Sequence, residues 1–302
     1  MFASLFSIIS FILSGYIAKR LKIIEQKQAL TLIDFVIYFA IPALIFEKIY
    51  HLEMSLTLLY LVFIGMIGTA IGVAVVTLVG WWLKFSRPTL VTMVMMASFG
   101  NTLFLGIPVL EGFLGEEALR EGIFYDQFAT AIPVALLGPF ILALASKEKA
   151  SVIQSASKIV RFPPVIALVA AFLLKSVPIP EFIFSTLKMF GSTVTPVALF
   201  AIGLQMVFSS IRTEWKPTLV VLSGKMILSP LCATLIILAL GIPMDESAHI
   251  AILQSAMPPM VLASAMVMKA QLNTSLAVST VAFGVGASLG IMPLLYSLLS
   301  FL

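Results

Sequence analysis

The chain has 302 residues, of which 61% are hydrophobic and only 11% are charged. A soluble domain carries roughly 25% charged residues, so this composition excludes an ordinary water-soluble protein and favours a membrane protein. The apolar runs are continuous rather than alternating, which excludes a transmembrane β-barrel. The formal net charge of +4 does not indicate nucleic-acid binding, because the basic residues follow a membrane pattern.

Apolar runs follow one another along the whole chain. A spanning helix needs roughly 20 residues, so the chain holds about ten helices joined by short loops. The first segment lacks a basic start and a clear cleavage site, so we expect a retained helix rather than a signal peptide. Cys232 lies in an apolar run and is expected to be a packing residue. The sequence therefore predicts an all-α membrane protein with these spans: 2–18, 29–49, 56–83, 89–111, 122–145, 163–177, 182–209, 217–241, 247–268 and 274–300.

The loops between these spans differ in charge. Only Lys48, Arg120 and Lys175 lie in one alternate set of loops. Cytoplasmic loops carry the excess of Lys and Arg, so the richer set is predicted to be cytoplasmic, with both termini outside the plasma (inner) membrane. Thirteen basic residues form that richer set: Lys19, Arg20, Lys22, Lys27, Lys84, Arg87, Lys147, Lys149, Lys158, Arg161, Arg212, Lys216 and Lys269.

The chain contains a weak internal repeat. Five spans before and five after a polar segment predict a first repeat at 1–145, a cytoplasmic linker at 146–161 and a second repeat at 162–302. Because five is odd, the repeats must lie in opposite orientations, and inverted repeats are a common transporter architecture. Three pairs of similar positions support the repeat, at separations of 154, 157 and 160: Pro42 with Pro196, Ser98 with Ser255, and Pro133 with Pro293.

Two predicted spans contain residues that interrupt helices. The stretch SFGNTLFLGIPVLEGFLG (98–115) places Gly100 and the polar Asn101 near the expected bilayer centre, and QSAMPPMVLASAM (254–266) contains two prolines in a row. A proline removes the hydrogen bond to the carbonyl four residues earlier, so Pro108 is expected to interrupt the helix by leaving the carbonyl of Phe104 without its usual partner. Irregular backbone at this depth is tolerated only where protein buries it or where it lines a wet cavity, and broken helices often mark transport sites. We therefore expect the two interruptions to meet and form a substrate site.

The chemistry expected at such a site favours an anion. A helix that restarts after a break presents unpaired N–H groups and about half a positive charge, which is an anion-binding arrangement suited to a carboxylate. The carbonyl groups freed by the prolines could instead hold a cation or water. The candidate substrate-binding residues are Gly100, Asn101, Thr102, Gln254, Ser255, Pro258, Pro259, Lys225, Asp126 and Gln127.

Each candidate has a structural alternative. Asn101 could join two helices by a hydrogen bond, and Thr102 or Gln254 could bond its own helix. Lys225 lies about 13 Å along its helix from the preceding loop, so it could reach partway to the surface or pair with a substrate or a carboxylate. Asp126, together with Gln127, could line the path.

The remaining polar residues are expected to be structural. Asp34 and Lys188 lie near opposite ends of their spans, Pro42 and Pro196 are expected to mark kinks, and His51 and His249 are expected to be solvated. The spacing of potential ligands around the histidines does not support a metal site. We expect neither a metal nor a cofactor.

The motifs resemble the auxin efflux carrier family, in its prokaryotic malate/malonate permease-like branch. Plant carriers pair P-N-T-x-x-x-G-I-P-L-L with A-L-P-Q, and this chain has GNTLFLGIPVL from Gly100 and AMPPMV from Ala256. FVIYFAIPALIF from Phe35, PVALFAIGLQM from Pro196 and KMILSP also resemble family segments. Gly100 stands in place of a proline and Pro259 in place of a glutamine, and the long cytoplasmic loop of many plant members is absent.

This resemblance implies a fold, a mechanism and a substrate class. The fourth and ninth helices would break and cross, and the protein would be a homodimer. A transport bundle (helices 3–5 and 8–10) would move like an elevator against a scaffold (helices 1, 2, 6 and 7). Prokaryotic relatives are associated with the transport of organic anions such as malate and malonate. A proton or a sodium ion could be the coupling ion.

Other functions were weighed against an organic-anion carrier. The pair Tyr125-Asp126 resembles the YD pair of intramembrane aspartyl proteases, but the other spanning aspartate, Asp34, lacks a glycine-rich context. A nucleotide-binding loop is missing from the sequence, which argues against ATP-driven pumping. A receptor or scaffold would not require two broken helices. The main alternative is a sodium-coupled symporter of bile-acid-like or other amphipathic anions, from the related bile acid/sodium symporter-like superfamily. We do not expect an enzyme.

Overall fold

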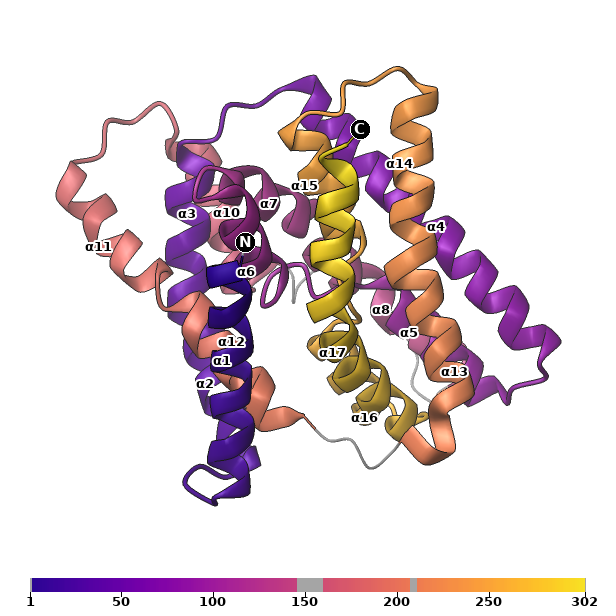
Figure 1. The fold of residues 1–302 in the computed structure, drawn as a ribbon. Coiled ribbons are helices and arrows are strands. Elements are labelled where there is room, and N and C mark those ends of the chain that lie inside the picture. The colour runs from indigo at the N-terminus through magenta and orange to yellow at the C-terminus, as the bar shows by residue number, and fades with distance from the viewer. Residues whose placement is uncertain (1, 146–159, 207–210, 302) are drawn as a thin grey trace. The chain divides into compact units, whose positions relative to one another are not determined.

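A computed structural model describes residues 2–145, 160–206 and 211–301 (Figure 1). The regular elements in this part of the chain are helices, joined at one point by an isolated β-bridge. The predicted all-helical class is therefore confirmed. All but the last two residues of the predicted linker 146–161 lie outside the described residues.

The chain divides by its internal contacts into two compact units. Unit 1 comprises Met1–Met54, Leu103–Phe124 and Ser157–Met206, and unit 2 comprises Ser55–Thr102, Tyr125–Ala156 and Val207–Leu302. Each unit takes segments from both predicted repeats, so this division differs from the division along the sequence, and the repeat boundaries stay a prediction.

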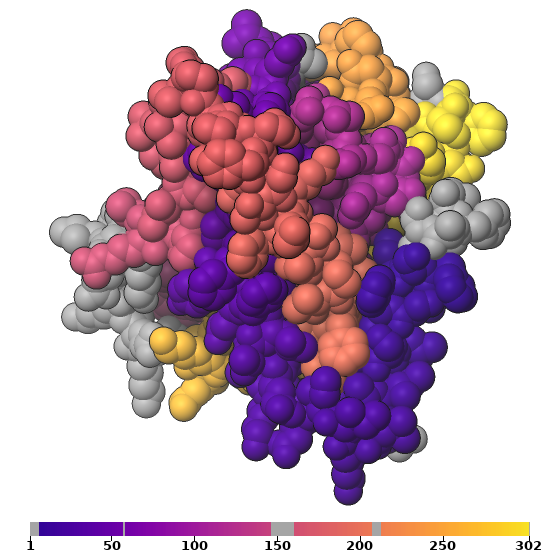
Figure 2. Space-filling view, turned by 90° about the vertical axis from the view of Figure 1, so that its left-hand side faces the viewer, coloured from indigo at the N-terminus to yellow at the C-terminus, as the bar shows by residue number. Residues whose placement is uncertain are grey.

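Unit 1 is built around helices from the start and the middle of the chain. The helix α1 packs along α12, which also contacts α2, while α3 packs against α10 and α11. Large apolar side chains of α11 such as Phe182 and Met189 are more than 70% exposed. Figure 2 shows salmon-coloured residues, the colour of this part of the chain, on the face toward the viewer. The helices of this unit are α1 (Phe2–Arg20), α2 (Ala29–Phe35), α3 (Ile41–Tyr50), α6 (Gly106–Leu114), most of α7 (Ala118–Asp126), α10 (Pro163–Leu174), α11 (Glu181–Gly191) and α12 (Val194–Gln205).

Unit 2 is organised around its longest helix, α4, which packs against α5, α14 and α15. The C-terminal helix α17 contacts α13, α5 and α16. The helices of this unit are α4 (Leu56–Trp82), α5 (Arg87–Ser98), α8 (Ile132–Ala143), α13 (Ile211–Ser223), α14 (Ser229–Ala239), α15 (Glu246–Ser255), α16 (Val261–Lys269) and α17 (Thr274–Leu299).

Within the described residues, three π-helical segments precede prolines. In each, the residue before the proline donates its N–H to the carbonyl five residues earlier. Proline has no N–H of its own, so the α-helical ladder loses a bond there, and a wider turn takes its place. Such segments occur frequently at functional sites. They are η2 (Val36–Ala40) before Pro42, η3 (Gln127–Ala131) before Pro133 and η4 (Gly224–Leu228) before Pro230.

Six described helical stretches are long and apolar enough to cross a membrane. The other four predicted spans correspond to α1, to the short α10, and to two pairs of helices that are each interrupted, α5 with α6 and α15 with α16. For these four, crossing the bilayer stays a prediction, as does the ten-span inverted layout. The six stretches are Gln26–Tyr50, Leu58–Trp82, Ala118–Ala143, Glu181–Gln205, Thr213–Ala239 and Thr274–Leu299.

Two of the predicted proline effects differ from the structure. Pro108 is the third residue of α6 and Pro196 is the third residue of α12. A proline in the first turn removes an N–H that would have no partner within the helix, so neither proline breaks or kinks the helix that contains it. The interruption near Pro108 lies before it, between Ser98 and Gly106.

Candidate functional site

The two interrupted segments bond to each other through their backbones. Gly100 forms an antiparallel bridge with Pro259. The N–H of Asn101 donates to the carbonyl of Pro258 at 2.7 Å, and the N–H of Met260 donates to the carbonyl of Phe99 at 2.9 Å. These bonds satisfy groups that the loss of helix would leave unpaired. Both interruptions are therefore present, and in unit 2 they lie against each other.

Glycine allows close packing at two places around the paired breaks. A Cβ at Gly100 would lie 3.1 Å from Cε of Lys225, and a Cβ at Gly284 would lie 2.8 Å from Cβ of Pro258 and 3.0 Å from Cδ of Pro259. The helix α17 therefore supports the proline break directly. A side chain at position 284 would force the prolines or the helix to shift.

Asn101 has the most unusual environment of the candidate residues. Its side chain is fully buried, and neither its Oδ1 nor its Nδ2 has a hydrogen-bond partner among the described residues. A buried polar group without a partner costs about 1–3 kcal/mol. The helix–helix hydrogen bond that was the structural alternative for Asn101 is not formed within the described structure.

Thr102, Asp126, Gln127 and Gln254 form one buried polar network. The hydroxyl of Thr102 donates to Oδ1 of Asp126 at 2.6 Å, and Nε2 of Gln127 donates to Oδ2 of the same carboxylate at 2.8 Å. Nε2 of Gln254 donates to the carbonyl of Thr102 at 3.2 Å. The network joins the interruption after α5 to the end of α7 and to the last turn of α15.

Lys225 lies on η4 and is 3% exposed. Its ammonium donates to the carbonyl of Ser255 at 3.0 Å and to the hydroxyl of Thr69 at 3.4 Å. Pro259 has no N–H to offer the Ser255 carbonyl, so the lysine takes the place of the missing donor. No carboxylate lies within ion-pair distance of Lys225 among the described residues.

The structure brings all ten candidate residues into unit 2 and joins them through these contacts. Sequence reasoning missed two residues at the site, Thr69 and Gly284. Thr69 lies in the run GMIGTAIG of α4, where the small residues were the available signal for close packing. Gly284 cannot be singled out from the sequence, because α17 contains five other glycines and alanines and the sequence does not show which of them faces the break.

The fold and the site together define a multi-pass membrane protein of the transport class. The chain matches the family described as "Membrane transport protein" over residues 1–296 and belongs to that family, the auxin efflux carrier family predicted from its motifs. It is 27% identical over 292 residues to an uncharacterized transporter of Methanothermobacter thermautotrophicus, covering 95% of both chains.

Two further relatives extend the comparison. The chain is 30% identical over 208 residues to an uncharacterized transporter of Methanocaldococcus jannaschii, with 65% of both chains covered. It is 30% identical over 256 residues to the lysosomal cholesterol signaling protein of Mus musculus, a match that covers 76% of this chain and 29% of the mouse protein. The similarity to the mouse protein thus concerns only one part of that longer chain.

Proposed function

We propose that the protein is a secondary transporter of small organic anions, mono- or dicarboxylates such as malate and malonate, that bind at the paired helix breaks. The observation that carries this proposal is the buried Asn101 side chain without a described partner. Its Nδ2 can donate to a carboxylate oxygen and its Oδ1 can accept from a hydroxyl group. A bound organic acid would thus remove the cost of the unpaired amide.

Electrostatics at the breaks favour an anion. Lys225 brings a buried ammonium group that is bonded only to neutral oxygens among its described partners. The helix α16 begins at Val261, one residue beyond the prolines, and the side chain of its N-cap residue, Met260, does not cap it. Its first N–H groups carry a partial positive charge. A carboxylate would complement both the ammonium group of Lys225 and the first N–H groups of α16.

The mode of transport belongs to the same proposal. The predicted scaffold spans 2–18, 29–49 and 163–177, and the span 182–209 as far as Met206, fall in unit 1 by their contacts. The site residues fall in unit 2. Such a division supports an elevator-type movement in which the site travels with unit 2. We further propose a homodimer in the plasma membrane with both termini outside, as the family resemblance and the loop charges indicate.

A coupling ion would act at Asp126. This fully buried carboxylate accepts hydrogen bonds from Thr102 and Gln127 and has no cationic partner among the described residues. A buried carboxylate of this kind can bind a proton or a sodium ion. The same observation supports the alternative, a sodium-coupled symporter of bile-acid-like or other amphipathic anions.

Uptake of labelled malonate into proteoliposomes tests the proposal. We expect Asn101→Ala to reduce the initial uptake rate at least tenfold, because loss of a hydrogen bond to a charged group costs about 1.5–3 kcal/mol. The matched control is Ser98→Ala, three residues earlier, where the hydroxyl bonds the carbonyl of Val94 within its own helix. The control should retain the wild-type rate.

The result that would contradict the proposal is equally clear. If Asn101→Ala took up malonate at the wild-type rate, Asn101 would lie outside the substrate site. Size-exclusion profiles of both variants should match that of the wild type, so that a loss of uptake reports on the site rather than on folding.

A further inference from the structure

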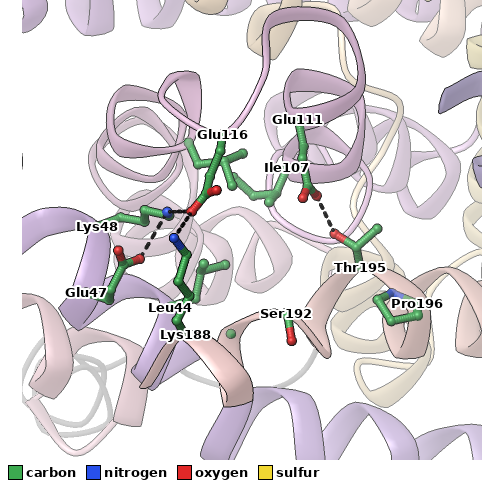
Figure 3. Close-up of a pocket in the computed structure, with 12 residues that line it drawn as sticks. Leu44, Glu47, Lys48, Ile107, Glu111, Glu116, Lys188, Ser192, Thr195 and Pro196 are labelled. Atoms are coloured by element: carbon green, nitrogen blue, oxygen red, sulfur yellow. Dashed lines mark hydrogen bonds and ion pairs between the residues drawn. The ribbon is translucent and has the colours of Figure 1, made fainter. Parts of the chain in front are cut away.

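Two lysines of unit 1 converge on a single carboxylate oxygen. The ammonium nitrogen of Lys48 lies 2.7 Å from Oε1 of Glu116, and that of Lys188 lies 2.9 Å from the same oxygen (Figure 3). Lys48 also pairs with Glu47 at 3.1 Å. This is the geometry by which two ammonium groups hold a free carboxylate, but here the carboxylate belongs to the chain itself.

The three side chains differ in how firmly they are held. Lys48 lies on α3 and Lys188 on α11, whereas Glu116 lies in the short connection between α6 and α7. That connection begins at Gly115, the residue that ends α6, whose φ of 91° suits glycine. The lysines are thus placed by helices, and the carboxylate is placed by a loop. Moving the loop requires less rearrangement than moving either helix.

A cavity of about 290 Å³ opens beside the three charges. This volume lies just below the range of about 300–1,000 Å³ for small-molecule sites. Leu44, Ile107 and Leu119 supply its apolar lining, and Glu111, Ser192 and Thr195 are the polar residues away from the lysines. Figure 3 shows Glu111 and Thr195 together at one side of the cavity and Glu116 with the lysines at the other. The cavity therefore has two different polar ends.

The two ends select different groups. At one end, the side chain of Lys48 is only 6% exposed and its shortest ion pair is the one with Glu116. Loss of a partner by a buried ammonium is costly, so an anion that replaces Glu116 restores the closer of the two ion pairs of Lys48. At the other end, Glu111 accepts a hydrogen bond from the hydroxyl of Thr195 at 3.1 Å. A carboxylate has about four acceptor positions, so Glu111 can also accept from a ligand, and it repels a second negative charge.

The geometry points to a second ligand site in this cavity, for a small carboxylate that carries a hydroxyl or ammonium group at its other end. The carboxylate of the ligand replaces Glu116 between Lys48 and Lys188, and its donor group bonds Glu111. Glu116 acts as a built-in competitor, and its displacement releases the α6–α7 connection from α3 and α11. This site lies wholly within unit 1 and is separate from the paired breaks.

Calorimetric titration with glycolate, a carboxylate with one hydroxyl, tests the site. The titrations use the full-length Asn101→Ala protein, in which the proposed function predicts weaker binding at the paired breaks. Adding Glu116→Gln should strengthen glycolate binding at least tenfold, because the lysines lose their internal anion. The matched control is Glu117→Gln, which removes the same charge from the same loop but breaks only the exposed pair with Arg120 at 2.8 Å. The control should leave glycolate affinity unchanged.

Two further titrations complete the test. Adding Lys188→Met to the Glu116→Gln protein should abolish the gain in glycolate affinity. Malonate should bind the Glu116→Gln protein more weakly than glycolate does, because the second carboxylate of malonate meets Glu111. Equal glycolate affinities for the Glu116→Gln and Glu117→Gln proteins would overturn the proposal, as would a gain that survives Lys188→Met. Malonate binding as tight as that of glycolate would contradict the role of Glu111. The malonate comparison rests on the proposed function, because it needs Asn101→Ala to weaken binding at the paired breaks. The comparison of Glu116→Gln with Glu117→Gln does not, because both proteins keep the same paired breaks.

Discussion

Lys225 and Asp126 are buried charges of opposite sign that do not pair with each other. Each is satisfied by neutral groups, Lys225 by the Ser255 carbonyl and the Thr69 hydroxyl, and Asp126 by Thr102 and Gln127. Hydrogen bonds to neutral partners offset only part of the cost of removing a charge from water. Burial at such cost is more readily explained by a ligand than by stability alone, since intramembrane charges typically mark substrate or ion pathways.

Replacing the lysine separates these explanations. Lys225→Met keeps the length of the side chain and removes its charge. We expect this variant to bind a dicarboxylate at least tenfold more weakly. Its affinity for an uncharged amide analogue should change less than threefold. Competition binding on purified protein measures both affinities. Equal losses for the two ligands would show that Lys225 supports the fold around Ser255 rather than the anion.

Some residue-level features could be predicted from the sequence and others could not. The interruptions follow from local chemistry, because Gly100, Pro258 and Pro259 disfavour a helix wherever the chain folds. The position of the Asn101 amide, without a described partner, depends on which groups fold near it. Likewise, Lys188 was predicted to be interfacial or structural, and its partner Glu116 lies 72 residues away, so the sequence alone does not reveal the pair.

At the scale of the elements, prolines shape the helices that carry the site. The sequence predicted a kink at Pro42, whereas the structure has a π-helical segment before it and equivalent segments before Pro133 and Pro230. The segments η3 and η4 carry Gln127 and Lys225. The wider turn rotates the following helix relative to an α-helix, and the choice between a kink and a π turn depends on packing that the sequence does not display.

Contact between α17 and the proline break gives a test at this scale. We expect Gly284→Ala to lower stability by about 1–3 kcal/mol, the usual cost of overpacking, because its Cβ would lie 2.8 Å from Pro258. Gly286→Ala is the matched control, since its Cβ would meet nothing within 4 Å, and alanine is favoured over glycine in a helix. Thermal unfolding followed by tryptophan fluorescence measures both. A Gly284→Ala protein as stable as the control would show that the break does not rest on α17.

The clasp formed by Glu116, Lys48 and Lys188 gives a pH prediction. Two hydrogen bonds, the first in size from Lys48 and the second from Lys188, lower the pKa of Glu116 from its ordinary value of 4.5 to about 2. A carboxylate with a lowered pKa stabilises the fold above its ordinary pKa, and this contribution is lost as the pH falls toward the lowered value. The charged groups near the clasp also include Glu47 and Glu117. Because Glu116 is half exposed, the effect should be small.

The measurement compares unfolding temperatures of the wild type and of Glu116→Gln across pH. The difference between the two unfolding temperatures should be constant from pH 8 to about 5.5 and should shrink below about pH 4.5. Glu117→Gln should not reproduce this profile. A difference that already changed between pH 8 and pH 6 would mean that another group, rather than Glu116, titrates in the clasp.

For the whole molecule, composition was enough to predict a helical membrane protein, because 61% hydrophobic residues leave few alternatives. Motif order was enough to predict the family. The grouping of segments by contact was harder to predict: Leu103–Phe124, expected to move with the transport bundle, belongs to unit 1 by its contacts. The two points at which the chain changes unit, after Thr102 and after Phe124, adjoin the hydrogen bond between Thr102 and Asp126.

The most direct test is equilibrium binding of malonate to purified protein, measured without sodium and again after sodium is added, for the wild type, Asn101→Ala and Ser98→Ala. An anion carrier whose site is the pair of helix breaks predicts saturable binding to the wild type and to Ser98→Ala, with affinity reduced at least tenfold in Asn101→Ala. Binding of equal affinity by all three proteins would contradict the account, and binding that required sodium would favour the symporter instead.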